Sequence, residues 1–210
     1  MTNDESELIG RSGSYQKGVA RRQEILDRAI EVFAERGADG TSLRQIAKEI
    51  GVSHAALLHY FDSREQLLVA VYEHAERVRS ERTGLRSIED PVGMLVEAAT
   101  HNVAVPGLVQ LYSTLVAAAL ESRNEVSRNF FTERFEVTRR ELAGLIARDQ
   151  DRGLIRKDVD ASAIASLLIA ASDGLQTQWL LDPNVDLRGF LQLFDILLTP
   201  AVQPQGSRAD

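Results

Sequence analysis

The chain has 210 residues and no cysteine, and this absence excludes several kinds of site. Without thiols there is no disulfide, no thiolate metal site and no cysteine nucleophile. No stretch approaches the ~20 apolar residues that a membrane span requires. The first twenty residues are acidic and polar and lack the apolar centre of a signal peptide. We therefore expect a soluble, cytoplasmic protein.

The net charge of the chain also limits which functions are possible. The net charge is −7, which at first argues against a nucleic-acid partner. The charge is unevenly distributed, because residues 15–64 hold eight lysines and arginines against seven acidic residues, a net of +1. A sequence-specific binder with a small footprint needs only a few well-placed cations. The charge distribution therefore permits DNA binding without establishing it.

The most informative segment is Thr41–Phe61, which has the pattern of two short helices around a tight turn. The hydroxyl groups of Thr41 and Ser53 stand where each helix needs an N-cap. Gly51 stands where a left-handed residue ends the first helix. Ala47 leaves room for two helices that cross closely. The inward positions at helical spacing are Leu43, Ile46, Ala47, Ile50, Leu57, Leu58 and Phe61.

Apolar residues recur at helical spacing along nearly the whole chain, so an all-α fold is predicted. The expected architecture is a three-helix DNA-binding head with a helix-turn-helix, followed by a larger helical-bundle regulatory and dimerisation domain. The expected helices cover residues 18–37, the hairpin at 41–61, a helix from after Asp62-Ser63 to about 82, then 92–104, a helix from after the break at Pro106-Gly107 to 121, and 125–151, 160–181 and 186–198. The expected organisation is a disordered tail at 1–17, the head at 18–78, the body at 79–200 and a flexible tail at 201–210.

The head resembles the TetR family of bacterial transcriptional regulators over about residues 18–78. The resemblance rests on Ile25, Ala29, Phe33, Glu35, Gly37, Thr41-Ser42, Ile46-Ala47, Gly51-Val52-Ser53, Tyr60-Phe61-Asp62-Ser63-Arg64 and Leu67. Segments 105–109 and 173–183 are similar to a carboxy-terminal subgroup that includes choline-responsive repressors. Two residues depart from the family pattern, since Leu58 replaces a common tyrosine and Arg64 a common lysine.

The resemblance implies that the second helix of the hairpin enters the major groove of DNA. Arg44, His54 and Ala55 are then candidates for base contacts. Phosphate contacts are expected from Thr41, Ser42, Ser53, His59, Tyr60 and Arg64. The structural alternatives are that Ser53 acts only as a cap and that the histidines are only solvated. Because His54 and His59 are five positions apart and do not share a helical face, no metal site is expected, and neither is a cofactor.

The last two long helices carry apolar stripes that suit a four-helix interface between two copies, as the family uses. The candidate interface residues are Leu168, Ala171, Leu175, Trp179, Phe190, Phe194 and Leu197. Part of each stripe must also be internal core. Because one hairpin contacts few bases, a homodimer on an inverted-repeat DNA operator is expected.

Polar residues inside otherwise apolar segments are candidates for contacts to a small-molecule effector. They are His101, Asn102, Gln110, Tyr112, Thr114 and Gln176. For each one, an internal protein partner is the commoner explanation. The predicted function is a sequence-specific transcriptional regulator, a repressor that an effector releases from its operator.

Two alternatives stay open. An effector-independent architectural DNA-binding protein would have the same head. A helical enzyme is the other alternative, although the chain lacks a glycine-rich phosphate loop and a carboxylate–histidine pair at metal spacing. No catalytic residue is therefore assigned.

Overall fold

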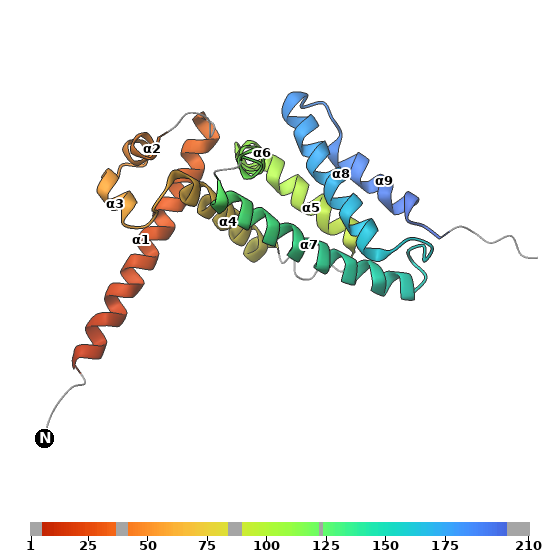
Figure 1. Cartoon of the computed structure of the whole chain (residues 1–210), viewed down its shortest axis with the longest axis horizontal. Coiled ribbons are helices and arrows are strands. Elements are labelled where there is room, and N and C mark those ends of the chain that lie inside the picture. The colour runs from red at the N-terminus through yellow and green to blue at the C-terminus, as the bar shows by residue number, and fades with distance from the viewer. Residues whose placement is uncertain (1–5, 37–41, 84–89, 122–123, 201–210) are drawn as a thin grey trace, which may run out of the picture. The chain divides into compact units, whose positions relative to one another are not determined.

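A computed structural model describes residues 6–36, 42–83, 90–121 and 124–200 (Figure 1). This part of the chain contains helices and no strand, which confirms the predicted all-α fold. The helices are α1 (Ser6–Arg36), α2 (Leu43–Glu49), α3 (His54–Leu58), α4 (Arg64–Thr83), α5 (Pro91–Ala104), α6 (Leu108–Ala119), α7 (Glu125–Asp151), α8 (Ala161–Leu181) and α9 (Leu187–Leu197). The expected tail at 201–210 lies outside the described residues.

Helix α1 begins earlier than the sequence analysis predicts. It starts at Ser6 instead of near residue 18, so residues 6–17 are helical and the expected disordered tail is wrong for them. The physical reason is that no proline precedes Pro91 in the chain, so nothing in this segment forbids the helical backbone.

The chain divides into two compact units. The amino-terminal unit comprises residues 1–83 and 105–131, and the carboxy-terminal unit comprises residues 84–104 and 132–210. The first unit is larger than the predicted head because α6 and the start of α7 pack with α4 through aromatic side chains. The functional division at residue 78 stays a prediction.

Helices α1 and α4 of the amino-terminal unit are joined by a buried histidine. Nε2 of His74 on α4 is 2.6 Å from Oδ1 of Asp27 on α1, and Nη2 of Arg77 is 2.7 Å from Nδ1 of the same ring. Because a guanidinium group only donates, Nδ1 is the acceptor and Nε2 carries the proton that it donates to Asp27. Arg77 also donates to Gln23 on α1 at 2.6 Å. These contacts fix the register of α4 against α1.

The carboxy-terminal unit is built from α5, α8 and α9 with the greater part of α7. Its core consists mainly of aliphatic side chains, including Leu95, Val96, Leu142, Ile146, Ile164, Leu168 and Leu191. Asp160 caps α8 by accepting from the Ala163 amide at 2.9 Å, and Asp186 caps α9 by accepting from the Gly189 amide at 2.9 Å. The caps set where each helix begins and so which side chains point inward.

Among the described residues, no single helix is long and apolar enough to cross a membrane. Helices α5 and α6 reach the required length and composition only when they are counted together across the break between them.

Replacing the buried histidine tests the link between α1 and α4. His74→Ala removes both side-chain hydrogen bonds and leaves a void, so we expect the free energy of unfolding to fall by about 2–3 kcal/mol. His59→Ala is the matched control, because His59 is exposed and its loss should cost less than about 0.5 kcal/mol. Urea denaturation followed by circular dichroism measures both. Equal, small losses would contradict the proposed link.

Candidate nucleic-acid interface

Helix α2 begins with a reciprocal pair of hydrogen bonds. The Ser42 hydroxyl accepts from the Gln45 amide at 3.3 Å, and the Gln45 side chain accepts from the Ser42 amide at 2.8 Å. This capping box satisfies two amides that the helix leaves open. The N-cap is therefore Ser42, and the prediction of Thr41 in that role is wrong. Thr41 itself lies outside the described residues, so its predicted phosphate contact stays a prediction.

The turn between α2 and α3 is set by a glycine and by an arginine from α1. Gly51 has φ +73°, a conformation that side chains disfavour, and it ends α2 as predicted. The Val52 amide donates to the carbonyl of buried Ala47 at 2.9 Å. Arg28 on α1 donates to the carbonyl of Ile50 at 3.0 Å. The last carbonyls of α2 are thus satisfied, and the turn is held against α1.

Helix α3 is short and presents one polar flank to solvent. It covers His54–Leu58 and so ends before Phe61, the last residue of the predicted hairpin. Ser53 is its N-cap and accepts from the Ala56 amide at 3.0 Å, as the sequence predicts. The exposed residues on and around α3 are Ser53, His54, Ala55, Leu58 and His59, so the inward position predicted for Leu58 is wrong. Three of the predicted DNA contacts are therefore grouped at the amino-terminal end of this helix.

The residues after α3 anchor it to the core. Phe61 is buried, which confirms its predicted core role, whereas neighbouring Tyr60 is partly exposed. The Tyr60 ring lies edge-on to His59, with 5.0 Å between centroids. The guanidinium of Arg22 on α1 lies 5.1 Å from the centre of the Phe61 ring. This cation–π contact ties α1 to the segment that follows α3.

The two predicted arginine contacts differ in their surroundings. Arg44 is exposed on α2. Arg64 at the start of α4 has 26% of its side chain exposed, and its Nη1 is 3.8 Å from Oε1 of Glu65. Exposed Arg44 is thus better placed to reach into a groove, and Arg64 to meet a phosphate at a helix start.

The residues predicted for the dimer interface fall into three groups. Leu168 is 0% exposed within one chain, so its assignment to a dimer interface is wrong. The reason is helical phase, because the buried row of α8 runs through Ile164, Leu168 and Ser172. The partly buried residues that pack on the core are Ala171, Leu175, Trp179 and Phe194. Phe190 and Leu197 are exposed on α9, at 48% and 60%.

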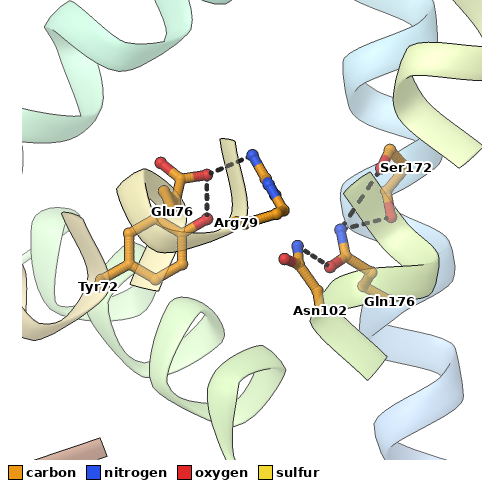
Figure 2. Close-up of polar contacts among 6 residues, drawn as sticks. All are labelled: Tyr72, Glu76, Arg79, Asn102, Ser172 and Gln176. Atoms are coloured by element: carbon orange, nitrogen blue, oxygen red, sulfur yellow. Dashed lines mark hydrogen bonds and ion pairs between the residues drawn. The ribbon is translucent and has the colours of Figure 1, made fainter. Parts of the chain in front are cut away.

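Two predicted effector-binding residues bind each other in the carboxy-terminal unit. The Asn102 amide on α5 donates to the Gln176 side chain on α8 at 3.0 Å, and Gln176 donates to the carbonyl of Ser172 at 3.3 Å (Figure 2). These internal partners account for their burial without a ligand. His101 and Thr114 are partly exposed and Gln110 is exposed, so a ligand role for this set stays a prediction.

Tyr112 belongs to an aromatic cluster in the amino-terminal unit. Its ring centre is 5.4 Å from that of Tyr72 on α4 and 5.4 Å from that of Phe131 on α7. Phe130 lies edge-on to Tyr72 and to Phe131. Edge-to-face packing of this kind stabilises the cluster. A carboxylate lies next to the Tyr72 hydroxyl.

That carboxylate is Glu76, one turn along α4 from Tyr72. The Tyr72 hydroxyl donates to Oε1 of Glu76 at 3.2 Å, and Arg79 lies 3.3 Å from the same oxygen (Figure 2). The side chains of Glu76 and Arg79 are only 17% and 13% exposed. Glu76 is thus held by the Tyr72 hydroxyl and by the Arg79 guanidinium, and its negative charge is paired within the chain.

Sequence reasoning missed four supporting residues, Arg22, Arg28, His74 and Glu76. Arg28 and His74 bind groups 22 and 47 positions away, and no local pattern signals such pairs. Within the part of the chain that the structure describes, no group of three histidine, aspartate or glutamate side chains could hold a metal ion.

The chain matches known proteins along most of its length. A family described as bacterial regulatory proteins, tetR family, matches residues 25–71, and the carboxy-terminal part of BetI-type transcriptional repressors matches residues 98–199. The chain is 34% identical over 164 residues to the HTH-type transcriptional regulator BetI of Rhizobium meliloti, covering 74% of this chain and 75% of that protein. It is 26% identical over 190 residues to the repressor AcnR of Corynebacterium efficiens, covering 90% and 96%.

A solved structure supports the same assignment. A transcriptional regulator from Saccharomonospora viridis in complex with choline has a TM-score of 0.66 and 26% sequence identity. The match covers 84% of this chain and 95% of that chain. With the exposed flank of α3 and its buried supports, these matches lead to one conclusion. The chain belongs to the TetR family and is a DNA-binding transcriptional regulator with a BetI-type carboxy-terminal domain.

Proposed function

We propose that this regulator is a dimeric repressor that binds an inverted-repeat operator and is released by a small organic effector. The observation that carries the DNA-binding part is the exposed group of Ser53, His54 and Ala55 at the start of a capped helix with a buried opposite face. A helix presented in this way can enter a major groove with its first residues against the bases.

Each exposed residue has a role that fits its chemistry. The His54 ring can exchange a hydrogen bond with a purine, and the Ala55 methyl can meet a thymine methyl. Arg44 can donate two parallel hydrogen bonds to a guanine. Phosphates would be met by the hydroxyls of Ser42 and Ser53 and by Arg64, with His59 and Tyr60 at the far end of α3.

Dimerisation is supported by apolar side chains that stay exposed in one chain. On α8 they are Leu167 and Leu181, 62% and 84% exposed. On α9 they are Phe190, Leu193, Ile196 and Leu197, and inward-facing Leu187 and Leu191 occupy the opposite side. Exposed apolar faces of this size mark interaction sites. Two copies packed through α8 and α9 would bury them and present two reading helices.

An organic cation is the effector class that we propose. Tyr72 and Tyr112 are buried in the aromatic cluster, and Glu76 is paired with Arg79. An organic cation bound here would therefore have to open the cluster and replace the Arg79 guanidinium beside Glu76. The match to BetI-type repressors and to a regulator in complex with choline supports the same class. A ligand beside α4 would favour one position of that helix and so alter the spacing of the two heads.

Two arginine variants distinguish a contact to a DNA base from a contact to the phosphate backbone. Arg44→Ala should weaken binding to a selected duplex by ~1–3 kcal/mol and relax the preference at one base pair, because a bidentate base contact is lost. Arg64→Ala should weaken binding evenly across sequences and flatten its salt dependence. Fluorescence anisotropy with single-base variants of the duplex measures both. An Arg44→Ala protein with unchanged affinity removes this residue from the interface.

A charge on the exposed apolar face should separate the dimer. Leu193→Asp places an unpaired carboxylate in the proposed contact, and we expect sedimentation to change from dimer to monomer at micromolar concentration. Leu154→Asp is the matched control, since Leu154 is 62% exposed but lies outside α8 and α9. If Leu193→Asp remains dimeric, or Leu154→Asp also dissociates, the interface lies elsewhere.

Choline is the first probe for the effector. Saturating choline should raise the melting temperature and lower the affinity for the operator, since a ligand of the folded state stabilises it by mass action. The uncharged carbon isostere of choline should change neither the melting temperature nor the affinity for the operator. Glu76→Gln should abolish the choline-induced shift, whereas Glu133→Gln, at an exposed position on α7, should retain it. If choline changes neither quantity, choline is excluded as the effector and the effector-independent alternative gains support.

A further inference from the structure

The amino-terminal part of α1 differs in charge from the rest of this acidic chain. Between Glu7 and Glu24 there are four cations, Arg11, Lys17, Arg21 and Arg22, and no acidic residue, although the chain as a whole has a net charge of −7. This positive segment precedes the helix-turn-helix and has no part in the hairpin itself. Clustered cations of one sign attract polyanions.

Lys17 and Arg21 share one side of α1. With about 100° per residue, Lys17 and Arg21 lie ~40° apart around the axis and ~6 Å apart along it. Both side chains are exposed. Lys17 has no acidic partner among the described residues, and Arg21 pairs with Glu24. Glu24 also pairs with Arg28 at 3.2 Å, so it would keep one cation if Arg21 turned to another anion.

Arg22, about 100° around the axis from Arg21, contacts the hairpin and so fixes the rotation of α1 against it. Arg22, next to Arg21, lies over the ring of Phe61, three residues beyond the end of α3. The amino-terminal half of α1 extends past the hairpin formed by α2 and α3 (Figure 1). The basic segment is thus attached to the reading unit and reaches outward from it.

We propose that Lys17 and Arg21 form a second DNA contact, to the phosphate backbone flanking the base pairs that α3 reads. The inference rests on the proposed DNA-binding function and adds a surface to it. A basic helix face is often only solvated; two features favour DNA here, namely the absence of acidic residues over the segment and its direct attachment to the end of α3. Such a contact carries no base preference and adds affinity that depends on salt.

The test is a pair of double variants with equal change in charge. Lys17→Gln with Arg21→Gln removes the proposed contact while keeping good helix formers. Arg140→Gln with Lys157→Gln is the control, since both residues are exposed cations of the carboxy-terminal unit. Circular dichroism and thermal unfolding check that both proteins remain folded. Affinity for a selected duplex is measured at several salt concentrations.

The first variant should bind about fivefold to fiftyfold more weakly than the wild type at moderate salt. The slope of log affinity against log salt should fall by about two, one for each lost phosphate contact, and the loss should be equal for specific and random duplexes. Hydroxyl-radical footprints should lose protection at the outer edges of the site. The control should match the wild type.

Three outcomes would overturn the inference. They are an unchanged slope, an unchanged footprint edge, or an equal loss in the control, which would reveal a general effect of net charge. In each case the wild type still binds its operator, so the proposed function survives. A wild type that binds no duplex would instead remove the proposed function.

Discussion

The five-residue helix α3 is too short to persist on its own in water, so the DNA contacts proposed for it depend on the packing that holds it. Leu57 and Phe61 bury its inner side, and Ser53 closes its first turn. Arg22 covers Phe61 from α1. Because the inner side is fixed, the outer flank of the helix faces solvent in one orientation. The base contacts proposed for it require that orientation.

Helix α1 is the common support of the head, and α4 is joined to it. Arg28 on α1 holds the end of α2, and His74 on α4 is bonded to Asp27 on α1. Positions 72 and 76 lie about 200° around the axis of α4 from position 74, so Tyr72 and Glu76 point to a different side. One side of α4 therefore meets the helix that supports the hairpin, and the other meets the aromatic cluster. The effector release that we propose would act through this double contact of α4.

The features that the sequence predicts correctly are local ones. Gly51, the Ser53 cap and the buried Ala47 and Phe61 follow from backbone conformation and helical spacing, which neighbouring residues determine. The choice of Ser42 over Thr41 as N-cap was missed, although the spacing indicates it. Gln45 stands three residues after Ser42, as a capping box requires, whereas Arg44 stands three residues after Thr41.

The features that the sequence does not predict depend on distant parts of the chain. Leu168 shares an apolar stripe with exposed residues, and only the packing of α5 and α9 against α8 decides which side is internal. Arg28 and His74 look like ordinary surface residues of amphipathic helices until their partners on other helices are known. The helical start of α1 at Ser6 was missed because polar composition alone does not prevent a helix.

The most direct test of the central claim is selection of bound duplexes from a random pool with the purified full-length protein. The account predicts enrichment of an inverted repeat whose half-sites are centred about one helical turn, or a multiple of it, apart. A pool that stays random, or that yields a single unrepeated site, would contradict the claim that paired α3 helices read DNA.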